Sequence, residues 1–387
     1  MEIKALKSSF LQSFGERAEQ SRVFFSPGRV NLIGEHTDYN GGWVFPCALS
    51  FGTYLVIRKR DDNTVKFATS NFDYKASVDL AKINEKHGKE WVNYPLGVMN
   101  QLISRGFKLG GMELYFSGNI PNGAGLSSSA SIEVVTAYAL NEIFGFGLDR
   151  IELVKLSQKA ENEFCGVNCG IMDQFAVGMG KANHAIALEC DTLKYELVPV
   201  KLGDYRLVIA NTNKRRGLAD SKYNERRGEC DKAVEYLNKV RPLKLLGELS
   251  YDEFANIQDN IKDETVRRRA HHVVSEIQRV KNAVASLKEG ALLEFGELMN
   301  ASHDSLRDDY EVTGIELDTL VEEARKIEGV IGSRMTGAGF GGCTVTLIHK
   351  DSVDKFYKEV AENYTRKTGL KPDFYTAEVG DGVKELK

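Results

Sequence analysis

The sequence has no long apolar run and no excess of basic residues. Within its 387 residues no stretch approaches the roughly 18 consecutive apolar residues that a membrane-spanning helix needs, so we expect no membrane partner. Residues 1–20 have helical apolar spacing and lack the apolar core and cleavage site of a signal peptide, which predicts a cytoplasmic protein. The formal net charge is −4, whereas proteins that bind a phosphate backbone usually carry a positive excess, so we expect no nucleic-acid partner.

Cysteine is scarce and scattered. Six cysteines are spread along the chain, and only Cys165 and Cys169 lie close together. This spacing favours reduced thiols over a disulfide framework, and it lacks the second pair of ligands that a zinc site needs. No internal repeat or low-complexity tract is present either.

Strand and helix patterns mix without a regular alternation. Apolar alternation predicts strands at residues 53–60, 64–70, 112–118, 184–189, 206–210, 331–336 and 343–348. Helical spacing predicts helices at residues 91–104, 127–145, 149–163, 219–240, 263–288, 290–306 and 315–327. This pattern favours an α+β fold over a doubly wound sheet. The weakest periodicity lies near residues 197–204, which predicts two domains, residues 1–200 and residues 201–387.

The segment Ser26–Gly42, SPGRVNLIGEHTDYNGG, concentrates charged and titratable side chains among glycines. Arg29, Glu35, His36 and Asp38 lie within ten residues and are followed by turn formers. We interpret it as a loop that faces a ligand rich in hydrogen-bonding groups, such as a sugar. The alternative is a solvated loop with an incidental ion pair between Arg29 and Glu35.

A second segment, residues 118–140, runs from a loop rich in glycine directly into an apolar helix. Gly123 and Gly125 allow backbone N–H groups to point inward, and a helix N-terminus adds unpaired donors with partial positive charge. Ser127, Ser128 and Ser129 add hydroxyls. No lysine follows the last glycine, so this is a phosphate loop of a type other than Walker A. A serine-capped helix after a glycine turn is the alternative.

Two acidic residues stand out in residues 160–180. Glu161 lies near the end of a predicted helix, and Asp173 lies in a largely apolar stretch bracketed by glycines. An arginine beside Asp173 would keep it ionised, as a general base or electrostatic anchor requires, and Arg29 is the candidate partner. The alternatives are a helix cap or structural ion pair for Asp173 and a solvated helix face for Glu161.

The segment GSRMTGAGFGGCTVTLI, residues 332–348, contains a formal G-x-G-x-x-G match at Gly337, Gly339 and Gly342. A dinucleotide fingerprint needs a helix that begins on these glycines, but a β-branched strand pattern follows here. We therefore interpret residues 337–342 as a glycine loop between two strands that closes against a bound nucleotide or sugar.

Together these segments resemble the galactokinase branch of the GHMP small-molecule kinases over most of the chain. GRVNLIGEHTDYN, residues 28–40, is similar to the galactokinase signature, whereas PNGAGLSSSA and MTGAGFGG are similar to motifs of the whole superfamily. The resemblance implies an N-terminal domain of the ribosomal S5 domain 2-like type and a ferredoxin-like C-terminal domain, with the active site between them. It also implies transfer of the γ-phosphoryl group of ATP to the C1 hydroxyl of α-D-galactose by a monomeric enzyme.

The resemblance further assigns roles to individual residues. Arg29 and Asp173 would flank the C1 hydroxyl and act in catalysis, and Ser129 and Glu161 would bind Mg²⁺. Galactose would be bound by Arg29, Glu35, His36, Asp38, Gly170, Asp173 and Tyr223. ATP, the co-substrate, would be bound by Ser70, Trp91, Gly123, Ala124, Gly125, Leu126, Ser127, Ser128 and Ser129; Trp91 has a core position as its alternative.

Two other functions stay open at this point. One is a catalytically inactive sensor of galactose and ATP, although such sensors are expected to lack part of the pair Ser129 and Ala130, which is intact here. The other is a kinase for a related sugar such as N-acetylgalactosamine, which the loop residues do not exclude.

Overall fold

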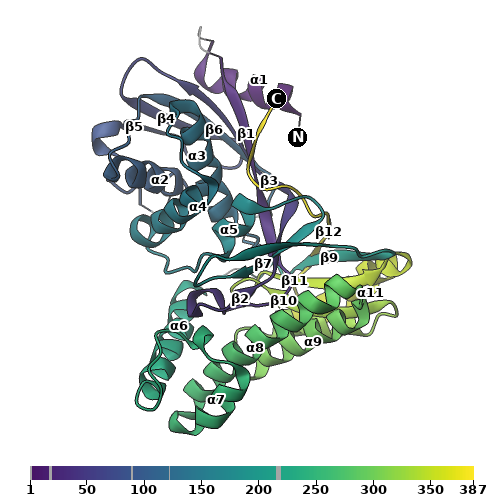
Figure 1. Cartoon of the computed structure of the whole chain (residues 1–387). Coiled ribbons are helices and arrows are strands. Elements are labelled where there is room, and N and C mark those ends of the chain that lie inside the picture. The colour runs from purple at the N-terminus through teal and green to yellow at the C-terminus, as the bar shows by residue number, and fades with distance from the viewer. Residues whose placement is uncertain (1, 17–19, 89, 122, 215–218) are drawn as a thin grey trace.

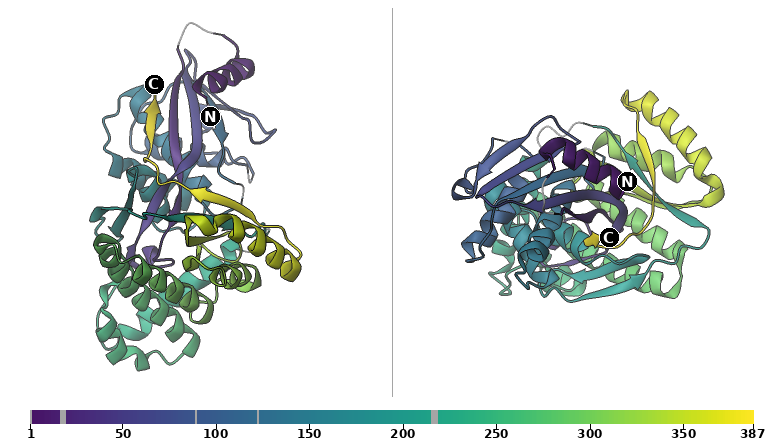
Figure 2. Two further views of the ribbon diagram at one scale, coloured as in Figure 1. Left: turned by 90° about the vertical axis from the view of Figure 1, so that its right-hand side faces the viewer. Right: turned by 90° about the horizontal axis from the view of Figure 1, so that it is seen from above.

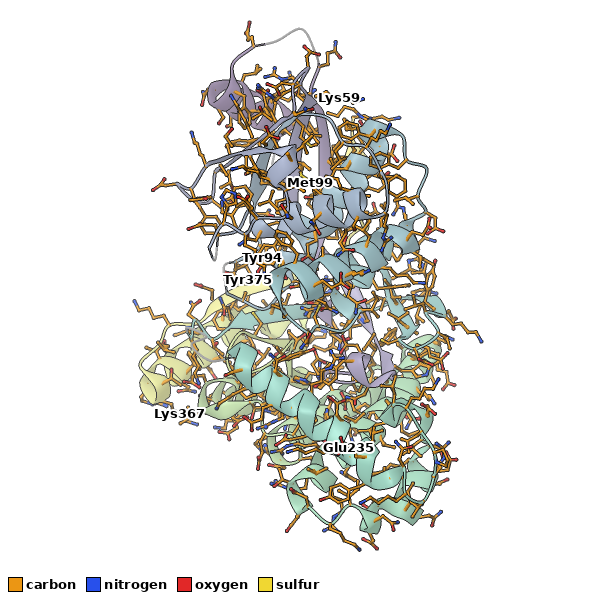
Figure 3. The ribbon with its side chains drawn as sticks, turned by 90° about the vertical axis from the view of Figure 1, so that its left-hand side faces the viewer. Lys59, Tyr94, Met99, Glu235, Lys367 and Tyr375 are labelled. Atoms are coloured by element: carbon orange, nitrogen blue, oxygen red, sulfur yellow. The ribbon has the colours of Figure 1, made fainter. Side chains whose placement is uncertain are left out.

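The computed structural model describes residues 2–16, 20–88, 90–121, 123–214 and 219–387. Figure 1 shows one sheet with its helices in the upper half and a second sheet with most of the remaining helices in the lower half. Lys59 and Glu235 lie toward opposite ends of the molecule in Figure 3. The mixture of helices and strands confirms the predicted α+β class.

The upper half is built on a sheet of six strands in the order β13-β1-β3-β6-β4-β5. Its pairs are antiparallel except for β4 with β6, which run parallel. The strands are β1 (Arg22–Asn31), β3 (Pro46–Lys59), β4 (Thr64–Thr69), β5 (Ala76–Asp79), β6 (Met112–Gly118) and β13 (Lys384–Leu386).

Helices cover both faces of this sheet because successive side chains of a strand point to opposite faces. Phe24 and Leu55 pack against α2 and α3 in one cluster, whereas Val23 and Val56 pack against α1 in another. The helices of this half are α1 (Ile3–Phe14), α2 (Asn93–Ser104), α3 (Ser128–Phe144), α4 (Arg150–Lys159) and α5 (Met172–Met179).

The lower half contains an antiparallel sheet in the order β10-β11-β9-β12. Numbered along the chain, this is the order 4-1-3-2 when it is followed from β12, which is the arrangement of a ferredoxin-like fold. Its strands are β9 (Tyr205–Asn211), β10 (Val330–Thr336), β11 (Cys343–His349) and β12 (Asp373–Ala377). Its helices are α6 (Ala219–Leu237), α7 (Tyr251–Ile257), α8 (Glu264–Glu289), α9 (Leu292–Asp308), α10 (Gly314–Arg325) and α11 (Val353–Thr368).

A shared core joins the two halves. Val30 at the end of β1 and Phe45 pack in one cluster with Ile209 of β9, Val280 of α8 and Val345 of β11. A small sheet, β2 (Trp43–Val44), β7 (His184–Glu189) and β8 (Tyr195–Pro199), lies at this junction. Short helical turns complete the chain: η1 (Asp38–Asn40), η2 (Leu80–Lys82), η3 (Ala160–Cys165), η4 (Leu246–Glu248), η5 (Gln258–Asn260) and η6 (Lys350–Ser352).

The structure corrects the interpretation of Ser26–Gly42 as a loop throughout. Strand β1 extends to Asn31, and its register shifts between Pro27 and Arg29 at a bulge. Every residue of β1 after Arg22 is buried, so the alternation that marks a half-exposed strand is absent from the sequence. Only the part after Asn31 is a loop.

Two further boundaries differ from the predictions. The helix predicted at residues 149–163 changes at Ala160 from α-helix to the wider π-helix η3, and Glu161 lies in this turn. At the C-terminus, β13 pairs with β1, so the last strand crosses back to the upper sheet, as Figure 2 shows. The division into residues 1–200 and residues 201–387 stays a prediction. The final strand, β13, is an exception to it, because it pairs within the upper sheet.

Candidate functional site

The predicted pairing of Arg29 with Asp173 is confirmed. Arg29 lies on β1 just after the bulge, and Asp173 lies in the first turn of α5. Arg29 Nε donates to Asp173 Oδ1 at 2.8 Å, and Nη2 donates to Oδ2 at 2.9 Å. The arginine side chain is 4% exposed, whereas the carboxylate, at 27%, is still accessible from the cavity that it lines. Such a two-pronged pair fixes the orientation of the carboxylate.

The loop before α3 contacts this pair directly. Arg29 Nη1 donates to the carbonyl of Gly125 at 2.7 Å, and Ser127 Oγ donates to Asp173 Oδ2 at 2.6 Å. Gly123, Gly125 and Ser127 all have positive φ angles, of 70°, 74° and 61°. The loop thus turns into the N-terminus of α3 beside the carboxylate, where the unpaired N–H groups of the helix favour an anion.

The loop after β1 places His36 among aromatic rings. His36 Nδ1 and the Tyr39 hydroxyl are 2.8 Å apart, and the Tyr39 and Tyr310 hydroxyls are also 2.8 Å apart. The Tyr223 ring lies 5.6 Å from the His36 ring, between centroids. Burial lowers the pKa of His36 to about 3, so the ring is neutral at ordinary pH and serves as a hydrogen-bonding group without charge.

Asp38 begins the turn η1 and faces Gly170. A Cβ atom on Gly170 would lie 2.0 Å from Asp38 Oδ2, so only glycine leaves room for the carboxylate. Burial and the nearby Asp173 raise the pKa of Asp38 to about 6, although it accepts hydrogen bonds from the backbone N–H groups of Tyr39 and Met172. Asp38 can therefore accept hydrogen bonds from a ligand that has donor groups.

Glu161 belongs to a buried acidic cluster beside the helix N-terminus. Its carboxylate accepts a hydrogen bond from the Ser129 hydroxyl and another from Gln174 Nε2, the latter at 2.5 Å. Gln174 Nε2 also lies 3.1 Å from Glu133 Oε2. Burial is the main influence that raises the pKa of Glu133 well above its ordinary value, and the charge of Glu161 adds to it. Burial raises the pKa of Glu161 as well, so the charged form of both side chains is disfavoured in this site.

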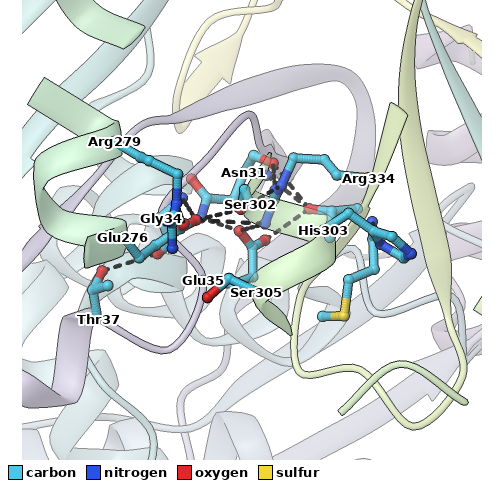
Figure 4. A network of polar contacts seen from close by, with 12 residues as sticks. Asn31, Gly34, Glu35, Thr37, Glu276, Arg279, Ser302, His303, Ser305 and Arg334 are labelled. Carbon is cyan, nitrogen blue, oxygen red and sulfur yellow. Dashed lines mark hydrogen bonds and ion pairs between the residues drawn. The ribbon is translucent and has the colours of Figure 1, made fainter. Parts of the chain in front are cut away.

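Glu35 lies within residues 32–42, the loop after β1 that is predicted to face a sugar and is called the sugar loop below. It is surrounded by hydrogen-bond donors of the protein itself. It is 1% exposed, and Oε2 accepts hydrogen bonds from Asn31 Nδ2 at 2.8 Å and Arg334 Nη2 at 2.5 Å. Oε1 accepts from Gly337 N at 2.8 Å and Thr336 Oγ1 at 3.1 Å. Figure 4 shows Glu35 beside Asn31 and beside Arg334 of β10. The alternative ion pair of Arg29 with Glu35 is thus replaced by two separate pairs.

These groups converge on a cavity of about 320 Å³ at the junction of the two halves. The cavity is lined by all of the predicted sugar-site and catalytic residues and by Glu161, which was predicted as a metal ligand: Arg29, Glu35, His36, Asp38, Gly170, Asp173, Tyr223 and Glu161. Gly337 and Ala338 of the glycine loop line it as well, and that loop leads into β11 as predicted. The structure therefore brings together segments that are more than 300 residues apart in the sequence.

Two residues that were predicted beside the nucleotide base lie away from this cavity. Trp91 is 9% exposed and packs edge-to-face on Phe67 and Phe116 in the core of the upper half. The Ser70 hydroxyl lies 2.7 Å from the Ser117 hydroxyl at the end of β4. The structure gives Trp91 the core position that was its alternative, and the proximity of both residues to a nucleotide stays a prediction.

Sequence reasoning missed several residues that contact the site. They are the buried polar side chains Glu133, Gln174, Arg334 and Glu276. An acid inside the apolar helix that follows the phosphate loop, and an arginine inside the β10 strand pattern, were the available signals. A buried charge needs a partner, so each of these positions predicted a polar contact without revealing its partner.

Two features are absent from the described residues. No helix in that part of the chain is long and apolar enough to cross a membrane. Those residues also contain no group of three or more His, Cys, Asp or Glu side chains placed to hold a metal ion. All six cysteines are free thiols, as predicted.

Comparison with known proteins agrees with this geometry. Residues 8–59 match the family model of the galactokinase galactose-binding signature, and residues 93–181 and 283–366 match the N-terminal and C-terminal domains of GHMP kinases. The chain is 56% identical to galactokinases of Clostridium tetani and Fusobacterium nucleatum over 389 aligned residues, covering 100% of this chain and 98% and 100% of those proteins.

Solved structures agree at the level of the whole chain. The crystal structure of Lactococcus lactis galactokinase complexed with galactose matches with a TM-score of 0.97 and 48% identity, over 99% of this chain and 100% of that one. Methanococcus jannaschii mevalonate kinase, at 20% identity and a TM-score of 0.62, shares the fold. The two-domain α+β architecture and its sugar-loop signature show that the chain belongs to the galactokinase family of GHMP kinases and is a sugar kinase.

Proposed function

We propose that the cavity holds galactose with its C1 hydroxyl on Asp173 and the γ-phosphoryl group of ATP at the N-terminus of α3. The observation that carries this assignment is the position of Asp173. Its carboxylate is oriented by Arg29, hydrogen-bonded by Ser127 of the phosphate loop and open to the cavity. A nucleophile on this carboxylate would lie next to the helix N-terminus, where anionic phosphate is stabilised.

In the reaction the C1 oxygen forms a bond to the γ-phosphorus, and the bond between that phosphorus and the oxygen of ADP breaks. Asp173 accepts the proton of the C1 hydroxyl and releases it to solvent after transfer. Arg29 holds the carboxylate in place through two hydrogen bonds, and its guanidinium would stabilise charge on the transferred group. Both groups are preorganised, because Arg29 also contacts the Gly125 carbonyl.

Sugar recognition falls to the loop after β1 and the turn before α5. Ionised Asp38 accepts hydrogen bonds from hydroxyls on the C3–C4 side of galactose, and the space beside it exists because residue 170 is glycine. Neutral His36 and the Tyr223 ring give the same cavity a partly apolar lining. A sugar presents both hydroxyls and an apolar face, so this combination suits it.

Ser129 and Glu161 fit a magnesium ion that arrives with ATP. Both supply hard oxygen donors, they already contact each other, and Glu161 lines the cavity. Two protein ligands are sufficient, because Mg²⁺ is usually held by one or two carboxylates together with phosphate oxygens and water. When bound, the ion would neutralise charge on the phosphates. Gln174 and Glu133 hold the Glu161 side chain in place from behind.

An assay of ADP release over several acceptors tests this function. Galactose should support rapid turnover, and N-acetylgalactosamine, galacturonate, glucose, mevalonate and homoserine should support little. A higher kcat/KM with any other acceptor would assign the site to that compound, and absence of turnover with all of them would indicate a sensor. We also propose that the enzyme is cytoplasmic and monomeric. Light scattering of the purified protein tests its oligomeric state.

A further inference from the structure

Two positive and two negative side chains meet in the interior behind the sugar loop. Arg334 and Glu35 form one pair at 2.5 Å, and Arg279 and Glu276 form the other at 2.6 Å. Arg334 and Glu276 approach to 4.0 Å, and the Ser302 hydroxyl bridges them, with 2.5 Å to Glu276 Oε1 and 3.1 Å to Arg334 Nε. The set is neutral overall, which makes its burial tolerable.

Each of the three guanidinium nitrogens of Arg334 donates a hydrogen bond, and the side chain is 0% exposed. Nη2 donates to Glu35, Nε donates to Ser302, and Nη1 donates to the carbonyls of Asn31 at 3.1 Å and Leu32 at 3.4 Å. One side chain on β10 thus fixes both the end of β1 and the loop that follows it. Figure 4 shows Arg334 between Glu35, Ser302 and Asn31.

The same carboxylate also fixes the glycine loop. Glu35 Oε1 accepts hydrogen bonds from Thr336 Oγ1 and Gly337 N, the residues that follow Arg334 by two and three positions. Gly337 in turn lies against the phosphate loop, since a Cβ atom on it would be 3.1 Å from the Gly125 carbonyl oxygen. Glu35 is therefore the point where sugar loop and glycine loop are joined.

The residue after Glu35 explains why this anchor matters for the sugar. His36 has a φ angle of 63°, which an L-residue adopts only when its surroundings hold it there. Gly34 N, on the other side of Glu35, donates to Glu276 at 2.9 Å. Burial by itself disfavours the charge of Glu276, but Arg279, His272, Arg334 and the Ser302 hydroxyl together outweigh burial, and the pKa of Glu276 falls to about 2.

We propose that Arg334 is a positioning residue for galactose: through Glu35 it sets the conformation of the sugar loop without touching the sugar. Its guanidinium supplies hydrogen bonds in three directions, which a lysine ammonium at the end of a flexible chain cannot reproduce. The proposal rests on the proposed function, because it takes the loop beside Glu35 as the sugar site.

Arg334→Lys is the test, with Arg58→Lys as the matched control. Arg58 is 2% exposed and pairs with Glu113 at 2.6 Å, but it lies in the upper sheet and does not line the described cavity. Both variants keep the positive charge but lose the planar guanidinium with its several N–H donors, so both should have a lower Tm than the wild-type protein. We expect Arg334→Lys alone to raise the KM for galactose by about tenfold while the KM for ATP changes less than about twofold, because lysine cannot hold Glu35, Ser302 and the carbonyls of β1 and the sugar loop at the same time.

A second readout and a milder variant keep the test decisive. The increase in Tm that saturating galactose produces should shrink in Arg334→Lys and remain in Arg58→Lys. If Arg334→Lys does not fold, Ser302→Ala decides, because it removes the bridge to Arg334 and leaves all four charges; we expect about a threefold rise in the KM for galactose. An unchanged KM for galactose in the folded variants would overturn the positioning role. Failure of the wild-type protein to phosphorylate galactose would instead refute the proposed function.

Discussion

Replacing Asp173 by asparagine tests the proposed mechanism most directly. The wild-type carboxylate accepts two hydrogen bonds from Arg29 and one from Ser127. An amide has one acceptor oxygen, and its NH₂ group would face a donor, so at least one of these three contacts becomes unfavourable. The amide also cannot accept the proton of the C1 hydroxyl. We expect kcat to fall by about 10²-fold to 10⁴-fold, the range of a positioned acid–base group.

The structure provides a matched control in Ser127→Ala. This change removes one hydrogen bond to Asp173 Oδ2 but leaves the carboxylate and Arg29 in place. A lost hydrogen bond to a charged group is worth about 1.5 kcal/mol at the lower end, which predicts about a tenfold loss of kcat. Asp173→Asn should therefore be at least about ten times slower than Ser127→Ala.

The measurement is ADP release at saturating galactose and ATP, with galactose binding followed by the shift in Tm. Asp173→Asn should retain a galactose-dependent shift, because the hydroxyl contacts of Asp38 and His36 are unaffected. A folded Asp173→Asn protein that keeps more than a tenth of the wild-type kcat would contradict the role of Asp173 as proton acceptor.

Three other predictions follow from the same geometry. Asp38→Asn should weaken galactose binding yet stabilise the fold at pH 7 by at most about 3 kcal/mol. The reason is that burial raises the pKa of Asp38 from 3.8 to about 6, so the folded state holds the proton of this carboxyl more tightly than the unfolded state does. The free energy of unfolding of the wild-type protein therefore falls as the pH rises from about 4 to 6. Denaturant titrations of both proteins at pH 4 and pH 7 check this, and an equal difference at the two values would count against it. Glucose should have a kcat/KM lower than that of galactose by roughly 10²-fold or more, because an inverted hydroxyl leaves Asp38 unpaired; comparable values would disprove this contact. Glu161→Ala should need more Mg²⁺ and be partly rescued by it, whereas Gly125→Val should lose ATP binding at any Mg²⁺ concentration, because Gly125 has a φ angle of 74°; an unaltered Mg²⁺ dependence of Glu161→Ala would refute the ligand role.

The local spacing of apolar residues was sufficient to predict most helices and strands. The apolar spacing of residues 128–144 and 264–289 is long and regular, and the structure has α3 and α8 there. Prediction failed where burial on both faces removes the alternation, as in β1, and where a helix widens without any change in its apolar spacing, as at η3. The pairing of β13 with β1 joins the two ends of the chain, and no local signal encodes such a contact.

The sequence by itself determined which segments form the candidate site, because its motifs are contiguous. The glycines and serines of residues 123–129 and the acids of the sugar loop lie within short segments, where turn and capping preferences act on neighbouring residues. Their proposed roles rest on these motifs. Tertiary structure alone decided what supports them. Arg334 and Glu276 contact the sugar loop across about 300 and 240 residues of chain, and only the packing of β10 and α8 against the end of β1 brings these charges together. Their partners could not be predicted, since a buried charge requires a partner but does not specify where in the sequence it lies.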